Sequence, residues 1–107
     1  MAAGEASALT VFDQWDHRTA TVTVHGDIDI ATAGAFRDRL VAVANERPAR
    51  VVIDLADVRF LDSAGLRAFV QLRKALPKDC QVVIRSPRRR TRQVFELTGL
   101  DTAFEFE

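Results

Sequence analysis

The stretch RVVIDLADVRFLDSAGL, at residues 50–66, contains the end of one structural element and the start of another. RVVIDL is a short apolar run rich in β-branched side chains, which predicts a strand covered on both faces. Further along, the apolar positions change to helical spacing, at Leu66, Phe69, Leu72 and Leu76. We therefore predict a strand, a loop and an amphipathic helix that begins within LDSAGL and ends at Pro77.

Two more helices are predicted on either side of this stretch. From Thr32, apolar residues recur at three- and four-residue steps, at Ala33, Phe36, Leu40 and Val43. This helix ends near residues 45–48. The other helix lies in SPRRRTRQVFELTGL, residues 86–100, where Ser86 and Pro87 suit the N-cap and the first helical position. Gly99 suits the left-handed position that follows a helix end.

The remaining segments are predicted to be strands. LTVFDQW and TATVTVHG, at residues 9–15 and 19–26, form an antiparallel hairpin with a tight polar turn at residues 16–18. QVVIR, at residues 81–85, is a second buried strand, and the tail AFEFE alternates as an edge strand does.

The order of these elements predicts an α/β fold. Short connections favour a small mixed sheet, in which an N-terminal antiparallel hairpin is followed by parallel βαβ units and amphipathic helices cover the sheet. Binding sites in such sheets form on the loops that leave the carboxyl ends of the parallel strands. Here these loops are residues 26–29, 58–63 and 86–87.

Length and composition restrict the classes of function. A chain of 107 residues with 48% hydrophobic content is expected to form one domain, residues 1–107, of which residues 1–8 are a flexible lead. Lys+Arg and Asp+Glu are both 15, so no net charge attracts nucleic acid or an anionic membrane. The single cysteine, Cys80, and the lack of a leader or membrane span indicate a cytoplasmic protein.

Several other side-chain groups have simple structural interpretations. The basic cluster is expected to be a solvated helix face without direct nucleic-acid contact; it consists of Arg85, Arg88, Arg89, Arg90 and Arg92. The aspartates lack the spacing of a metal site, so neither a metal nor a cofactor is expected. The large aromatic residues are expected in the core or over the sheet: Trp15, Phe36, Phe60, Phe69 and Phe95.

Ser63 is the residue on which the function depends. A helical wheel places it on the solvent side with Arg67, Gln71 and Lys74, and Asp62 is a good N-cap candidate. Ser63 could be a cap or surface residue, a nucleophile or a modification site. The G-x-S-x-G motif of hydrolases disfavours the nucleophile, because Leu61 occupies the first glycine position and no histidine is placed as a base.

A modification site is the interpretation with the clearest physical consequence. A phosphoryl group on Ser63 would add close to two negative charges at the amino end of a helix, where they are favoured, with Arg67 one turn away. The fold should therefore tolerate it. Together with Asp62, Asp27 and Asp29, the phosphate would concentrate negative charge on one exposed edge and so control the binding of a partner.

Three segments of the chain resemble the STAS domain family, which is found in sulfate transporters and bacterial anti-sigma factor antagonists. They are HGDIDIATA (25–33), VVIDLADVRFLDSAGLRAFV (51–70) and SPRRRTRQVFELTGLDTAFE (86–105). The resemblance implies that the unphosphorylated protein binds an anti-sigma factor serine kinase and so frees a sigma factor. It also implies that phosphorylation of Ser63 breaks the complex, that a phosphatase restores it, and that the chain has no catalysis of its own.

The resemblance also assigns roles to individual residues. Ser63 becomes the phosphoacceptor, Asp62 its acidic neighbour and Gly65 a position that allows close approach. The expected partner-binding set is Asp27, Asp29, Asp62, Ser63, Ala64, Gly65 and Arg67. Asp27 stands where relatives often have glutamate, and Arg67 where many have a small residue, so Arg67 is expected to restrict the choice of kinase. The alternative is a STAS scaffold or carrier domain that binds a nucleotide or lipid, or serves a larger sensory or transport complex, independently of Ser63.

Overall fold

The computed structural model describes residues 9–107, so the predicted flexible lead at residues 1–8 lies outside the described residues. The elements follow in the order β1 (Thr10–Asp16), β2 (Thr19–His25), α1 (Ala33–Asn45), β3 (Arg50–Asp57), α2 (Ser63–Ala75), β4 (Gln81–Arg85), α3 (Arg89–Leu97), η2 (Leu100–Thr102) and β5 (Glu105–Phe106). This order agrees with the strands and helices predicted from the sequence.

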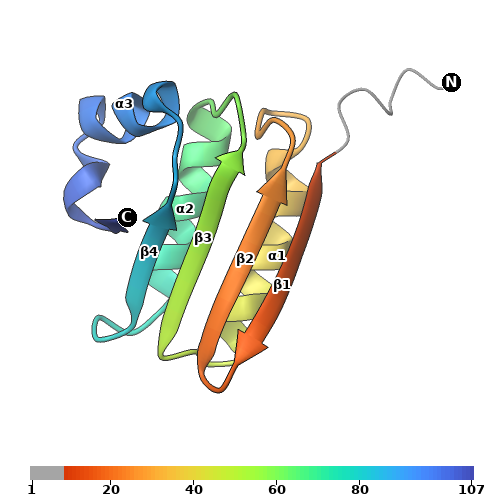
Figure 1. Cartoon of the computed structure of the whole chain (residues 1–107), viewed down its shortest axis with the longest axis vertical. Helices are drawn as coiled ribbons and strands as arrows, with labels where there is room; N and C mark the ends of the chain where they lie inside the picture. The colour runs from red at the N-terminus through yellow and green to blue at the C-terminus, as the bar shows by residue number, and fades with distance from the viewer. Residues whose placement is uncertain (1–8) are drawn as a thin grey trace, which may run out of the picture.

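All the described strands form one mixed sheet in the order β1-β2-β3-β4-β5 (Figure 1). β1 pairs antiparallel with β2, and each later pair is parallel. The predicted α/β class, the hairpin and the C-terminal edge strand are therefore confirmed. Because β2, β3 and β4 run in the same direction, the loops after them lie at one end of the molecule, at the top of Figure 1.

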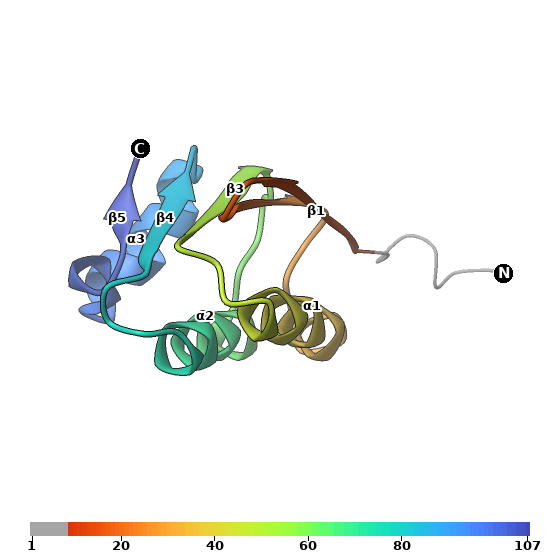
Figure 2. The ribbon, with the colours of Figure 1, turned by 90° about the horizontal axis from the view of Figure 1, so that it is seen from below.

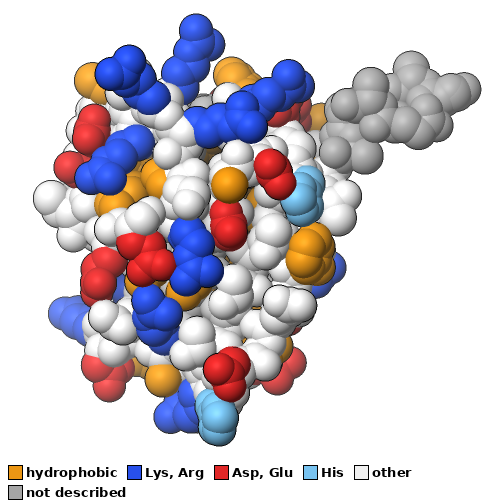
Figure 3. Space-filling view, in the orientation of Figure 1, with side chains coloured by type: hydrophobic (Ala, Val, Ile, Leu, Met, Phe, Trp, Pro, Cys, Tyr) orange, Lys and Arg blue, Asp and Glu red, His pale blue; other side chains and the backbone are white. Residues whose placement is uncertain are grey.

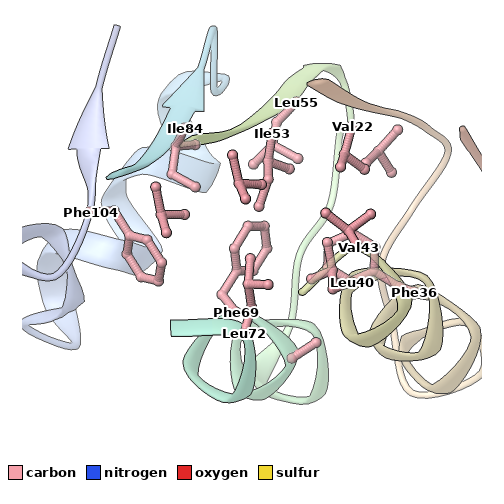
Figure 4. Close-up of a cluster of buried hydrophobic side chains, with 14 of the residues drawn as sticks. Val22, Phe36, Leu40, Val43, Ile53, Leu55, Phe69, Leu72, Ile84 and Phe104 are labelled. Carbon is pink, nitrogen blue, oxygen red and sulfur yellow. The ribbon is translucent and has the colours of Figure 1, made fainter. Parts of the chain in front are cut away.

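The helices α1 and α2 cover one face of the sheet (Figure 2). Apolar side chains of the strands and helices meet between these two layers, as Figure 4 shows for Phe69 of α2 and Ile53 of β3. The Phe69 ring is fully buried. Its centroid lies 5.3 Å from Phe36, 5.2 Å from Phe95 and 6.0 Å from Phe104, so one aromatic cluster joins all three helices to the C-terminal segment.

The opposite face of the sheet has no helix over it among the described residues (Figure 2). Val52 and Val83 are nevertheless 1% and 2% exposed on this face. They are neighbours in the strand register, and ion pairs of Glu107 with Arg50 and Arg85 lie on the same side. The prediction that β3 is buried on both faces is therefore confirmed. On this face, however, other side chains of the sheet cover the strand, and no helix does among the described residues.

Two of the large aromatic residues are partly exposed, which corrects the prediction for Phe60. Phe60 is 51% exposed in the loop after β3, and Trp15 is 37% exposed on the edge strand. The Trp15 indole N–H donates a hydrogen bond of 2.8 Å to Asp13, so its polar atom is satisfied at the surface. Phe36, Phe69 and Phe95 are fully buried, as predicted.

The start of α3 also differs from the prediction. The helix begins at Arg89 with Arg88 as its N-cap residue, so Ser86 and Pro87 are neither cap nor first helical residue. Ser86 has φ of 53° and its backbone N–H donates a hydrogen bond of 2.9 Å to the Glu107 carbonyl. This hydrogen bond ties the residue after β4 to the C-terminal segment, and the chain turns at Ser86 before α3 begins. At the other end, Gly99 has φ of 76° after the helix, which confirms its predicted left-handed position.

Candidate functional site

Ser63 is the first residue of α2, directly after the loop that follows β3. Asp62 is the N-cap: its carboxylate accepts hydrogen bonds from the backbone N–H groups of Ala64 and Gly65, at 2.9 and 3.2 Å. This confirms the predicted cap. Because Asp62 satisfies these N–H groups, the hydroxyl of Ser63 is not needed to begin the helix.

The exposed side of α2 agrees with the helical wheel. Ser63, Arg67, Gln71 and Lys74 are exposed, whereas the apolar side chains of the helix face the core. Ala64 and Arg67 line a hollow of about 120 Å³ between the amino-terminal halves of α1 and α2, with Gly34 and Arg37 on its other side. The serine therefore lies on a largely solvent-facing surface beside a shallow groove.

The loop after β2 lies directly against the start of α2. Ile28 forms a parallel bridge with Leu61. The Ile28 N–H donates to the Phe60 carbonyl at 2.9 Å, and the Asp62 N–H donates to the Ile28 carbonyl at 3.1 Å. The sheet pairing therefore continues beyond the strand ends, and it brings the predicted Asp27–Asp29 segment next to Ser63.

The two aspartates of this loop are used differently. Asp29 accepts hydrogen bonds from the N–H groups of Ala31 and Thr32, at 2.9 and 3.1 Å, and thereby fixes the turn into α1. The buried Thr32 hydroxyl donates to the Asp27 carbonyl at 2.8 Å. One carboxylate oxygen of Asp27 is buried without a hydrogen-bond partner among the described residues. Asp29 thus holds the loop, while Asp27 keeps a free acceptor.

Gly65 is buried on the inner side of the first turn of α2. A Cβ atom there would lie 2.6 Å from Ile28 Cγ2 and 3.1 Å from the Ile28 carbonyl oxygen. It would also lie 2.4 Å from a methyl carbon of Leu61. At Gly65 the chain's own loop after β2 approaches α2 closely, and the residue is buried.

The loops before α1 and α2 carry two exposed apolar side chains that the sequence interpretation did not include in the site. Ile30 is 85% exposed in the loop before α1, and Phe60 is 51% exposed in the loop before α2. Exposed apolar residues beside an exposed polar centre are typical of protein interaction sites. The sequence held this signal for Phe60 alone, because Phe60 does not fit the apolar period of the helix that follows it, whereas Ile30 lies three residues before Ala33 and does.

The site has few groups suited to catalysis. His25 Nδ1 lies 2.8 Å from a carboxylate oxygen of Asp57 and the ring stacks on Phe12, and His17 is at the hairpin turn beside Asp16. Neither histidine has a hydrogen bond to Ser63 among the described residues. Burial raises the pKa of the Cys80 thiol, which makes it a poor nucleophile. Among residues 9–107, no helix combines the length and hydropathy required to cross a bilayer.

Replacing Asp62 by alanine should lower the free energy of unfolding by about 1 kcal/mol, because two N–H groups of the first turn lose their acceptor. Chemical denaturation of the two proteins measures this difference. Asp62→Asn is the matched control, since its side-chain oxygen still caps the helix and only the charge is removed. If Asp62→Ala is as stable as Asp62→Asn, the cap is not what holds the first turn.

A family model described as Mlab, STAS domain, matches residues 11–105. The anti-sigma-F factor antagonist RsfB of Mycobacterium tuberculosis H37Rv is 30% identical over 104 residues, which cover 97% of this chain and 84% of that protein. The anti-sigma-B factor antagonist of Bacillus subtilis is 35% identical over 80 residues, which cover 74% of this chain and 72% of that protein.

A solved structure agrees over almost the same length. The crystal structure of an anti-sigma factor antagonist from Mycobacterium paratuberculosis has a TM-score of 0.87 and 32% identity, and covers 94% of this chain and 86% of that one. The fold and the site define a small α/β domain that presents one serine from the helix after its central strand. With the family match and these relatives, the chain belongs to the STAS domain family.

Proposed function

We propose that this protein is an anti-sigma factor antagonist that is controlled by phosphorylation of Ser63. With a free hydroxyl at Ser63, it binds an anti-sigma factor serine kinase and frees a sigma factor in the cytoplasm. Phosphorylation ends the binding, and a phosphatase restores it. The chain is a binding protein in this scheme and carries out no reaction of its own.

The observation that carries the proposal is the exposed hydroxyl of Ser63 at a helix start that another residue caps. A kinase must reach the hydroxyl from solvent, and its removal or modification must not unfold the protein. Asp62 meets the second condition, because it supplies the cap itself. The relatives named as anti-sigma factor antagonists give the class of partner.

The surroundings of Ser63 suit an interface that one anion can disrupt. Ile30 and Phe60 supply exposed apolar surface for a partner, and Asp27 and Asp62 lie on the adjoining loops. A phosphate would add charge next to these carboxylates at the centre of the docked surface, where an unpaired charge is costly. Within the chain, the helix amino end and Arg67 one turn away would stabilise the same phosphate. The modification therefore changes binding more than folding.

Labelling with a kinase tests the proposal directly. Anti-sigma factor kinases from the source genome, each expressed alone, are incubated with the protein and ATP, and the labelled residue is identified by mass spectrometry. We expect one kinase to label Ser63 only, and Ser63→Ala to remain bound to that kinase in the presence of ATP.

Ser86→Gly is the control, because Ser86 is also exposed at this end of the molecule and glycine suits its positive φ. This variant should be labelled like the wild type. The proposal is wrong if no kinase binds or labels the wild type. A protein that binds a nucleotide or lipid equally well with and without Ser63 would instead support the scaffold or carrier role.

A further inference from the structure

A second small recess opens at the same end of the molecule, between the loop after β3 and the start of α3. It has a volume of about 120 Å³ and is lined by Arg59, Phe60, Leu61, Arg90, Thr91 and Val94. Leu61 lies two residues before Ser63, and the side chain of Phe60 is half exposed at the rim. A partner that covers Ser63 would therefore also reach this recess.

The arginines near the recess are not equally free. Arg85 pairs with Glu107, Arg92 pairs with Glu96 and lies 4.5 Å over the Phe106 ring, and Arg88 donates to the Ala56 carbonyl. The basic cluster of the sequence is therefore divided, since these residues already have partners in the fold. Arg59 and Arg90 have neither an ion pair nor a side-chain hydrogen bond among residues 9–107, and they line the recess from the loop after β3 and from α3 respectively.

Charge and hydrogen bonding both indicate an acidic occupant. Figure 3 shows Lys and Arg side chains gathered over this end of the molecule, although the chain as a whole has no net charge. Thr91 lines the recess and is 1% exposed, and its hydroxyl oxygen is buried without a hydrogen-bond partner among the described residues. Buried hydroxyls without a partner are rare and unfavourable, and a carboxylate oxygen at this position would accept from it.

The size of the recess restricts the occupant further. Pockets for whole small-molecule ligands usually have about 300–1,000 Å³. The recess has about 120 Å³, which is enough for one side chain but not for a nucleotide. A glutamate or aspartate side chain meets all these conditions: its carboxylate is small, pairs with two guanidinium groups and accepts from a hydroxyl.

We infer that this recess receives an acidic side chain of the anti-sigma factor and is a second point of attachment beside Ser63. The inference rests on the proposed function. Arg59 and Arg90 then contribute to the affinity for the kinase, and the Thr91 hydroxyl positions the bound carboxylate. These residues are separate from the serine that is phosphorylated. Substituting them should therefore change the affinity for the kinase and not the rate of phosphoryl transfer.

Charge reversal at the arginines is the test, with the cognate kinase that the labelling experiment identifies. Arg59→Glu and Arg90→Glu should each weaken binding at least about tenfold and reduce its dependence on salt. In the phosphorylation assay, the KM for this protein should rise by a similar factor while kcat at saturation stays unchanged. Replacing the matching acidic residue of the kinase by lysine should restore the binding of Arg90→Glu.

Two further variants separate this role from general effects. Lys78→Glu makes the same change of charge at the exposed turn before β4, at the opposite end of the sheet, and should bind like the wild type. Thr91→Val removes the hydroxyl but keeps the shape of the side chain, so it should weaken binding without lowering the melting temperature.

The outcomes distinguish this inference from the proposed function. If the wild type binds a kinase, and Arg59→Glu and Arg90→Glu bind it as well as Lys78→Glu does, the recess is not an attachment point and only this inference is wrong. If the wild type binds no anti-sigma factor, both are wrong. A loss of binding in Thr91→Val together with a lower melting temperature would also contradict the inference, because it would assign the hydroxyl to folding.

Discussion

Replacing Ser63 by glutamate should weaken the binding of the anti-sigma factor by about a hundredfold, since a charge that is buried in an interface without a partner costs several kcal/mol. The introduced carboxylate would lie beside Asp62 and close to the Asp27 loop. The exposed side chains of Ile30 and Phe60, on the loops before α1 and α2, are apolar surface that a partner would cover. Isothermal titration of both proteins with the cognate kinase measures the difference.

The same substitution should leave the fold intact. A negative charge at the first position of a helix is favourable by about 0.3–1 kcal/mol, so the melting temperature should stay constant or rise slightly. Ser63→Gln is the matched control, because it has the size of glutamate without its charge. If Ser63→Gln weakens binding as much as Ser63→Glu, the effect is steric and the proposed charge switch is wrong. Unchanged binding of both variants would place the interface elsewhere.

Much of the fold could be predicted because the relevant signals are local. The period of the apolar residues changes from strand to helix within residues 50–66, and the short connections allow few arrangements of the strands. The cap at Asp62 and the turn at Gly99 are also local, since each depends on a side chain or φ angle within one turn of the chain. These features were predicted correctly for that reason.

The features that were missed depend on contacts between distant segments. Ser86 was predicted as a helix cap, but its backbone N–H donates to the carbonyl of residue 107 and its φ is positive, so α3 begins only at Arg89. Phe60 was assigned to the core because aromatic residues usually are buried, whereas the pairing of residues 26–28 with residues 57–62 turns it outward. The exposed surface at Ile30 and Phe60 arises from the same pairing.

The stretch at residues 62–67 therefore has two functions that the sequence alone did not separate. Asp62 and Gly65 shape the start of α2: one caps the helix, and the other makes room for the loop after β2. Ser63 and Arg67 face solvent and carry the proposed recognition. Asp62 and Gly65 fix the start of α2 and thereby the positions of Ser63 and Arg67. A change in the packing at Gly65 should therefore also disturb the surface around Ser63.

Replacing Gly65 by alanine should lower the free energy of unfolding by about 2 kcal/mol. The new methyl group would meet Ile28 and Leu61 at less than 3.0 Å, and overpacking of this kind costs about 1–3 kcal/mol. The higher helix propensity of alanine returns at most about 1 kcal/mol. The melting temperature should fall by about 5–10 °C for a domain of this size. Thermal and denaturant unfolding measure both quantities.

Gly34→Ala is the matched control for this substitution. Gly34 is also in the first turn of a helix, but a Cβ atom there would have no neighbour within 4 Å. We expect this variant to gain up to about 1 kcal/mol, because alanine loses less backbone entropy on folding than glycine. Opposite signs for the two substitutions would show that the contact with Ile28, and not helix propensity, decides the effect at Gly65. Equal stabilisation of both variants would contradict the close approach of the two loops, because the methyl group at residue 65 would then have been accommodated without strain.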